Sequence, residues 1–135
     1  MRFAICNEVF ADRPLAEGFA LARRLGYEGV EIAPFTLSDS LGADAELRDA
    51  RRLSADARRA TRDAAADAGL EVVGLHWLLA KTDGFYLTSP DEAIRRRTAD
   101  YVVALAELAA DLGGRVLVLG SPGQRNLLPG VDHDA

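Results

Sequence analysis

Three glycines at nearly equal spacing constrain the fold of this 135-residue sequence more than any other feature. Gly26, Gly69 and Gly113 lie 43 and 44 residues apart. Each follows a helical run and precedes a short run of branched apolar residues, in the segments LGYEGVEI, AGLEVVGL and LGGRVLVL. Glycine at such a position can adopt the left-handed conformation that ends a helix. The regular period therefore predicts a repeated helix-to-strand unit.

The elements predicted around these glycines alternate between strands and helices. Strands are expected at residues 2–6, 29–33, 71–76 and 115–120, and helices at 14–25, 54–68 and 89–112. In the last helix, Ser89 is predicted as the N-cap, with Pro90 at the first helical position and Glu92 three residues after the cap. Alternating strands and helices predict an α/β fold with a parallel sheet. We expect one domain over residues 1–135, with four strands and three main helices.

The composition excludes several classes of protein. The formal net charge of −5 disfavours binding to nucleic acid or to an anionic membrane. Cys6 is the only cysteine, so no disulfide can form within the chain. The N-terminus lacks the features of a signal peptide, and no apolar run approaches the length needed to cross a membrane. These features predict a cytoplasmic protein.

Superposing the repeats predicts which side chains share a face of the sheet. Large apolar residues are expected to point at the helices, in the order Val30, Val73 and Leu117, then Ile32, Leu75 and Leu119. The alternate positions face the other side in two layers: Glu31, Gly74 and Val118, then Ala33, His76 and Gly120. Glu31 and His76 are therefore expected on one face, with His76 nearer the carboxyl edge.

Four residues near that edge are candidates for chemistry, and each has a structural alternative. A carboxylate at Glu31 is costly to bury unless it is paired or bound to metal, but it can also fix neighbouring side chains. His76 suits proton transfer or metal ligation, or it is a satisfied structural histidine. Glu8, which follows Asn7 after the first strand, is a base or supports a metal ligand, or is a solvated carboxylate. Trp77 packs against the apolar face of a sugar, or it covers the core.

The loop after the last strand, GSPGQRN, carries further donors. Ser121, Gln124 and Arg125 offer a hydroxyl, an amide and a guanidinium group for substrate binding. Arginine binds carboxylate or phosphate through two hydrogen bonds. The alternative is a Pro-Gly turn whose polar side chains have no role in binding. The second histidine, His133, is expected to be exposed in the tail.

Several segments, taken together, resemble a known family. FAICNEVF, GYEGVEIAPF, AGLEVVGLHWLL and TSPDEAIRRRTADYVVALAELAADLGGRVLVLGSPGQR are similar to the sugar phosphate isomerase/epimerase family. This family belongs to the xylose isomerase-like TIM-barrel superfamily, which includes an AP-endonuclease branch. The resemblance implies a (β/α)₈ barrel that binds a divalent metal such as Mn²⁺, Mg²⁺, Co²⁺ or Zn²⁺. It also implies two glutamates as acid and base, and metal ligands on the later strands.

The resemblance gives roles to individual positions of this sequence. Glu31 matches the glutamate of the family's second strand, and His76 matches the histidine after the third. In the endonuclease branch that histidine binds metal, so His76 is the candidate metal contact of this chain. A full barrel needs about 250 residues. The sequence is therefore expected to form the first half of a barrel, with the main metal ligands beyond residue 135.

Three functions follow from this resemblance. The first is a sugar or sugar-phosphate isomerase/epimerase that transfers a proton next to a carbonyl group with the help of a metal, and is incomplete in this chain. The second is a non-enzymatic or degenerate half-barrel, whose open sheet edges and inner face would favour a homodimer. The third, a hydrolase similar to the AP endonucleases, is disfavoured by the acidic charge. The expected partner is a small carbohydrate or a related molecule.

Overall fold

Four parallel strands form the sheet of the computed structural model, which describes residues 1–37 and 49–132. In chain order the strands are β1 (Ala4–Cys6), β2 (Gly29–Ile32), β3 (Glu71–His76) and β4 (Val116–Val118). Three α-helices alternate with them: α1 (Leu15–Arg24), α2 (Ala55–Asp67) and α3 (Glu92–Asp111). Three short 3-10 helices follow strands, namely η1 (Asn7–Phe10), η2 (Pro34–Thr36) and η5 (Pro122–Gln124), and a further one, η4 (Ala50–Arg52), precedes α2.

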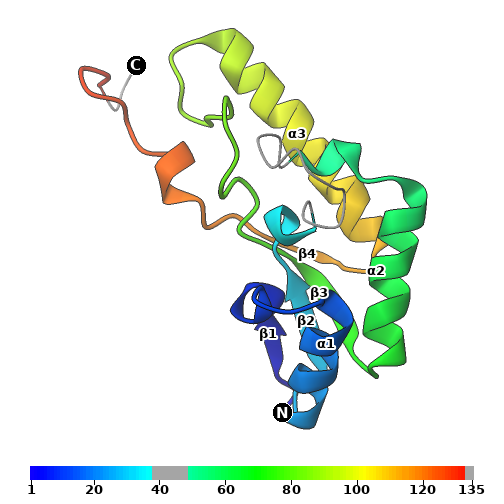
Figure 1. Cartoon of the computed structure of the whole chain (residues 1–135). Helices are drawn as coiled ribbons and strands as arrows, with labels where there is room; N and C mark the ends of the chain where they lie inside the picture. The colour runs from blue at the N-terminus through cyan, green and yellow to red at the C-terminus, as the bar shows by residue number, and fades with distance from the viewer. Residues whose placement is uncertain (38–48, 133–135) are drawn as a thin grey trace.

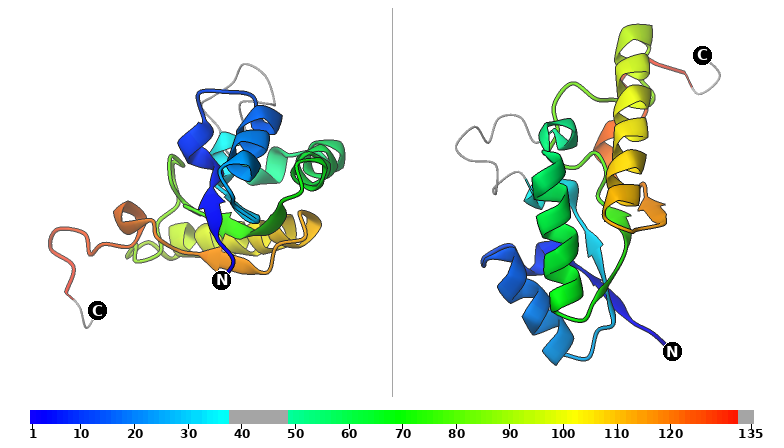
Figure 2. Two further views of the ribbon diagram at one scale, coloured as in Figure 1. Left: turned by 90° about the horizontal axis from the view of Figure 1, so that it is seen from below. Right: turned by 90° about the vertical axis from the view of Figure 1, so that its right-hand side faces the viewer.

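The strands lie in the sheet in the order of the chain, β1-β2-β3-β4 (Figure 1). Helix α1 contacts α2, and α2 contacts α3, so the helices follow one another around one side of the sheet (Figure 2). The predicted α/β class is confirmed: the described residues form four of the eight strands that a TIM barrel contains. None of the helices in this described part is both long and apolar enough to span a membrane.

The hydrophobic core lies between the sheet and the helices. Phe19 on α1, Ile32 on β2, Leu75 on β3 and Leu105 on α3 are completely buried. Along β2 the buried residues Val30 and Ile32 are two positions apart, and along α3 buried residues recur at steps of three or four, at Tyr101, Leu105 and Leu108. The helices therefore cover one face of the sheet and leave its other face, which we call the inner face, without a layer of helices.

The helix ends follow the glycine pattern but differ in detail at α3. Gly26, Gly69 and Gly113 have φ values of 94°, 74° and 85°, as expected for residues that end helices. The predicted N-cap Ser89 is wrong. Asp91 caps α3 instead, and its carboxylate accepts a hydrogen bond from Ala93 N at 2.8 Å. A carboxylate also interacts favourably with the positive end of the helix dipole, which favours Asp91 over the hydroxyl two residues earlier.

The predicted register of the sheet is wrong in two places. β2 and β3 shift register between Val30 and Glu31, so that Val30 pairs with Val72 and Glu31 pairs with Gly74. Val72 is buried on the helix side, whereas Val73 reaches the inner face, where its Cγ2 lies 2.9 Å from the position of a Cβ built on Gly29. An extra residue in one strand changes the alternation beyond it, and periodicity alone does not predict such a bulge.

The second difference concerns β4. Gly74 pairs with Val116 rather than Val118, and Leu117 pairs with Leu75 rather than with Val73. Leu117 and Leu119 were predicted to be buried against helices, but 36% and 42% of their surface is exposed. β4 is an edge strand among the described residues, with a neighbouring strand on one side only, so its side chains are less covered than those of the central strands.

Candidate functional site

A carboxylate and an imidazole meet at the carboxyl edge of the inner face. His76 is the last residue of β3, and Glu31 is the third residue of β2. The Nδ1 atom of His76 lies 2.7 Å from Oε2 of Glu31. Both side chains are partly exposed, at 28% and 24%. Alternation of strand positions predicts that these two residues share one face, and they do so in the structure, because the bulge precedes both of them.

The short contact determines how the imidazole is oriented. An ionised carboxylate only accepts hydrogen bonds, so His76 donates its Nδ1 proton to Glu31. In a neutral imidazole this leaves the lone pair on Nε2. Nε2 has no hydrogen-bond partner among the described residues. The pair can therefore present a nitrogen base, or a metal ligand whose direction is set by the carboxylate behind it.

Trp77 follows His76 in a strained backbone conformation. Its φ is 57°, which non-glycine residues rarely adopt. Such a residue costs about 1–3 kcal/mol, and strain of this kind is found mainly at functional sites. The ring centroids of His76 and Trp77 are 5.4 Å apart, with a tilt of 44°. The indole thus lies against the imidazole and limits its movement.

Cys6 occupies the same face and lies beside Glu31 as its pairing partner in the sheet. The pKa of the Cys6 thiol is raised to about 11, mainly by burial and to a smaller extent by the charges of Glu8 and Glu31. The backbone N–H groups of Glu8 and Asn7 act in the opposite direction. A thiol with this pKa is protonated near neutral pH, so it does not act as a nucleophile. Glu8 itself lies in η1, directly after β1, and its side chain is half-buried.

The loop after β4 is attached to the segment after β3. Ser121 is 2% exposed, and its Oγ accepts a hydrogen bond from Leu79 N at 3.0 Å. Leu87 N donates to Gln124 O at 2.7 Å. η5 accordingly lies beside the segment after β3 (Figure 1). The Gln124 side chain is half-buried and that of Arg125 is exposed. The substrate-binding role of the three residues stays a prediction, and His133 lies outside the described residues.

Asn7 is a polar residue of this edge to which the sequence analysis assigned no role. It is 4% exposed and lies directly after β1. Its Oδ1 accepts from Ala33 N at 2.8 Å, and its Nδ2 donates to Thr36 Oγ1 at 2.7 Å. Asn7 therefore ties the end of β1 to the end of β2. The sequence feature that could have identified this role is an asparagine immediately after a strand, where asparagine side chains often form hydrogen bonds to the backbone.

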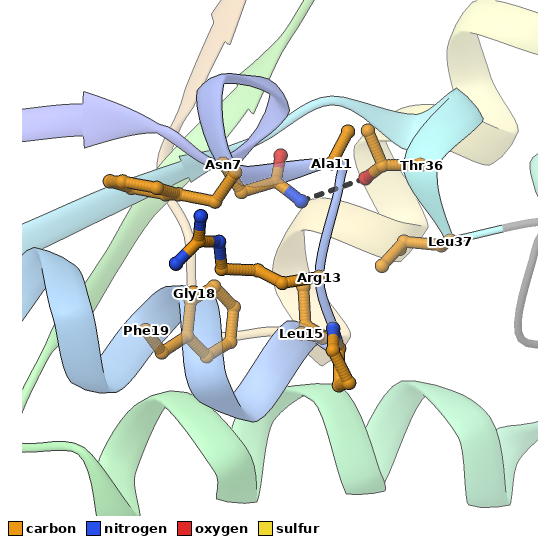
Figure 3. Close-up of a pocket in the computed structure, with 10 residues that line it drawn as sticks. Asn7, Ala11, Arg13, Leu15, Gly18, Phe19, Thr36 and Leu37 are labelled. Carbon is orange, nitrogen blue, oxygen red and sulfur yellow. Dashed lines mark hydrogen bonds between the residues drawn. The ribbon is translucent and has the colours of Figure 1, made fainter.

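A pocket of about 360 Å³ lies next to Asn7, between η1, α1 and η2 (Figure 3). It does not include Glu31 or His76. Its wall is mostly apolar, and its polar groups have partners: Asn7 bonds to Thr36, and Arg13 pairs with Asp12 at 3.0 Å. Because its polar groups are already satisfied, we take the Glu31–His76 pair, rather than this pocket, as the candidate functional site.

The residues fit a metal site only in part. His76, with Glu31 bonded to its other nitrogen, has the arrangement that metal-binding histidines usually show. Residues 1–37 and 49–132 contain no group of three or more histidine, cysteine, aspartate or glutamate residues that could hold a metal ion. A typical metal site in an enzyme has at least three protein ligands. The described residues thus offer one candidate ligand with a carboxylate behind it, and they do not complete a metal site.

Comparison with known proteins identifies a family for this arrangement. The family model described as "Xylose isomerase-like TIM barrel" matches residues 19–135, which is most of the chain. The match includes Glu31, His76, Trp77 and the loop of Ser121, whereas Glu8 lies before it. No curated protein matches the sequence.

Proposed function

The chain belongs to the xylose isomerase-like TIM-barrel family, and from this membership we propose that it forms part of a sugar or sugar-phosphate isomerase/epimerase-type active site. The reaction is the transfer of a proton at the carbon next to a carbonyl group. The hydrogen bond of 2.7 Å between His76 Nδ1 and Glu31 Oε2 carries the proposal. It lies at the carboxyl edge of the strands, where TIM-barrel enzymes have their active sites.

The proposed role of His76 follows from its orientation. Because Nδ1–H of His76 donates a hydrogen bond to Glu31, Nε2 is the atom that accepts or returns a proton or ligates a metal. Glu31 is a positioning residue, because it acts through the imidazole: it holds the tautomer and stabilises a positive charge that develops on the ring. Glu8 is proposed as a second carboxylate at the same edge, on the side of Cys6.

Trp77 and the loop after β4 are proposed to bind the substrate. An indole presents an apolar face on which the C–H groups of a sugar pack. Arg125 has no ion-pair partner among the described residues, so its guanidinium is free to bind a phosphate or carboxylate group. Ser121 and Gln124 hold the loop through their contacts with Leu79 and Leu87.

A divalent metal is proposed as the cofactor. When bound, such an ion polarises the carbonyl oxygen of the substrate and so acidifies the neighbouring C–H bond. His76 is the residue of the described chain that would hold it, and the remaining ligands would come from strands outside the described residues. His76 and Glu31 orient and exchange the proton in either case.

Exchange of substrate hydrogen with solvent tests the proposal without knowledge of the product. Aldose and ketose phosphates are incubated with the protein in D₂O, with and without Mn²⁺ or Mg²⁺, and deuterium next to the carbonyl is followed by NMR. We expect exchange that decreases at least 100-fold in His76→Asn and at least tenfold in Glu31→Gln. Glu107→Gln, an exposed carboxylate on α3, is the matched control. Exchange that is equally fast in His76→Asn would contradict the proposed role.

A further inference from the structure

Lys81 is the only lysine of the sequence, and it lies in the segment that follows β3. Its Nζ atom is 4.5 Å from the ring centroid of Phe35, which lies in η2, just after β2. β2 and β3 are the neighbouring strands that carry Glu31 and His76. The ammonium group of Lys81 therefore lies at the carboxyl edge of the sheet, where the segments after these two strands meet.

The backbone of Lys81 is strained. Its φ is 56°, a left-handed conformation that residues other than glycine rarely adopt. Trp77 has the same conformation, with a φ of 57°, so strained residues stand at both ends of one short segment. Residues of this kind persist where their neighbours over-determine the backbone, and they cluster at sites that bind ligands.

Buried contacts hold this segment in place. Leu78 and Leu79 are 2% and 0% exposed. The backbone N–H of Leu79 donates to Ser121 Oγ at 3.0 Å, and Thr82 Oγ1 donates to Leu79 O at 2.6 Å. Lys81 thus extends from an anchored turn, and its ammonium group is positioned before a ligand arrives.

The charge of Lys81 has no carboxylate partner in the part of the chain that the structure describes. Neither Asp83, two residues further on, nor any other described carboxylate forms an ion pair with it. The ring of Phe35 attracts the ammonium group but has no net charge. By contrast, the exposed Arg96 on α3 pairs with Glu92 at 2.6 Å. The ammonium group of Lys81 is therefore available to an anion.

A second cation belongs to a segment that is bonded to this one. Arg125 directly follows η5, in the loop that Ser121 attaches to Leu79. Lysine binds phosphate as a point charge, whereas arginine binds it through two hydrogen bonds. The formal net charge of −5 disfavours a polyanion such as nucleic acid. Two cations on connected segments fit a small molecule that carries one phosphate group.

We propose that Lys81 binds the phosphate group of the substrate, so that the site selects phosphorylated sugars over free sugars. The inference rests on the proposed function, because it assigns the substrate class of the same site. Glu31 and Glu8 are carboxylates near this edge, and they disfavour an anion unless a cation offsets them. Lys81 is a specificity-determining residue, since it binds a part of the substrate that does not react.

Binding of compounds that cannot react tests this role apart from catalysis. Sorbitol phosphate and sorbitol, which lack a carbonyl group, are titrated into the isotope-labelled protein, and the amide signals of residues 77–82 are followed by NMR. We expect sorbitol phosphate to bind more tightly than sorbitol by about tenfold, as a hydrogen bond between charged groups contributes. Lys81→Gly should abolish this preference, and Lys81→Arg, which keeps the charge, should restore most of it.

Lys81→Gly removes the charge without straining the backbone, because glycine readily adopts a φ of 56°. Its thermal unfolding should therefore resemble that of the unsubstituted protein. Arg96→Ala is the matched control, since it removes the same charge from an exposed position on α3 and should leave the preference unchanged. A preference that survives in Lys81→Gly, or that falls equally in Arg96→Ala, would overturn the proposal.

Gluconate distinguishes a phosphate from a carboxylate. If gluconate binds as tightly as sorbitol phosphate and depends equally on Lys81, the ligand class is a sugar acid and the proposal is wrong.

Hydrogen exchange in D₂O separates this inference from the proposed function. If an aldose and its phosphate exchange at equal rates, in the unsubstituted protein and in Lys81→Gly alike, the role of Lys81 is overturned while the reaction stands. If sorbitol phosphate binds through Lys81 but no sugar exchanges hydrogen, the phosphate site stands and the reaction is contradicted.

Discussion

Replacement of Gly74 by alanine should separate β4 from the sheet. Gly74 is buried in the middle of β3, and it pairs with Glu31 on one side and Val116 on the other. A Cβ built on Gly74 lies 1.9 Å from Val116 O, 2.7 Å from Val116 C and 2.9 Å from Val116 Cα. These are backbone atoms, so no side-chain rotation can relieve the contact. Gly74→Ala must therefore move a strand.

The size of the effect follows from the distance that β4 has to move. Ordinary contact begins at 3.4 Å, so Val116 O must retreat by about 1.5 Å. The hydrogen bond from Arg115 N to Val73 O is 2.9 Å long, and a shift of that size stretches it beyond hydrogen-bond range. Overpacking costs about 1–3 kcal/mol, and each lost hydrogen bond costs about 1 kcal/mol. We expect a loss of about 2–4 kcal/mol in the free energy of unfolding.

Urea denaturation followed by circular dichroism measures this loss. An unchanged m-value shows that the variant and the unsubstituted protein expose the same amount of surface when they unfold. Gly123→Ala is the matched control: its Cβ would meet nothing within 4 Å and its φ is not positive, so it should change stability by less than 1 kcal/mol. If Gly74→Ala costs less than 1 kcal/mol, β3 and β4 do not approach as closely as described, and the register at His76 must be revised.

Three other perturbations give separate checks. Ser121→Ala leaves Leu79 N–H buried without its acceptor, and should cost about 1–3 kcal/mol in urea unfolding, with faster exchange of that amide by NMR. Asn7→Ala removes the acceptor of Ala33 N–H and should cost about 2 kcal/mol or more; an unchanged midpoint would contradict the role of Asn7. Since the pKa of Cys6 is raised from 9.0 to about 11, stability should be constant below pH 9 and decrease between pH 9 and 11, while thiolate absorbance at 240 nm increases only near pH 11.

The order of the elements could be predicted because it depends on local chemistry. Glycines at the helix ends and branched apolar runs after them mark each unit without reference to the rest of the chain. The N-cap of α3 could not be assigned so well, because Ser89 and Asp91 both suit a cap and only the geometry of the preceding segment selects Asp91. Such choices between adjacent polar residues depend on tertiary structure.

For the candidate site, the sequence predicts that Glu31 and His76 lie on the same face of the sheet, but not how they contact each other. Alternation along β2 and β3 brings Glu31 and His76 to the same side, and the bulge at Val73 does not disturb this because it precedes both Gly74 and His76. The bulge itself was not predictable, since Val72 and Val73 are chemically identical and either can face the helices. The exposure of Leu117 was likewise missed, because an apolar strand has the same sequence whether it is central or at an edge.

The contacts at the carboxyl edge explain why the Glu31–His76 pair can be held in one geometry by short loops. Asn7 fixes the end of β2 from the side of β1, and Ser121 fixes the segment after β3 from the side of β4. Both are buried and both bond to backbone N–H groups, which do not change rotamer. Glu31 and His76 therefore lie between two anchored segments, and a site held in this way loses little entropy when a ligand binds. The positive φ of Trp77 is consistent with this view, because a strained residue persists only where its neighbours over-determine the backbone.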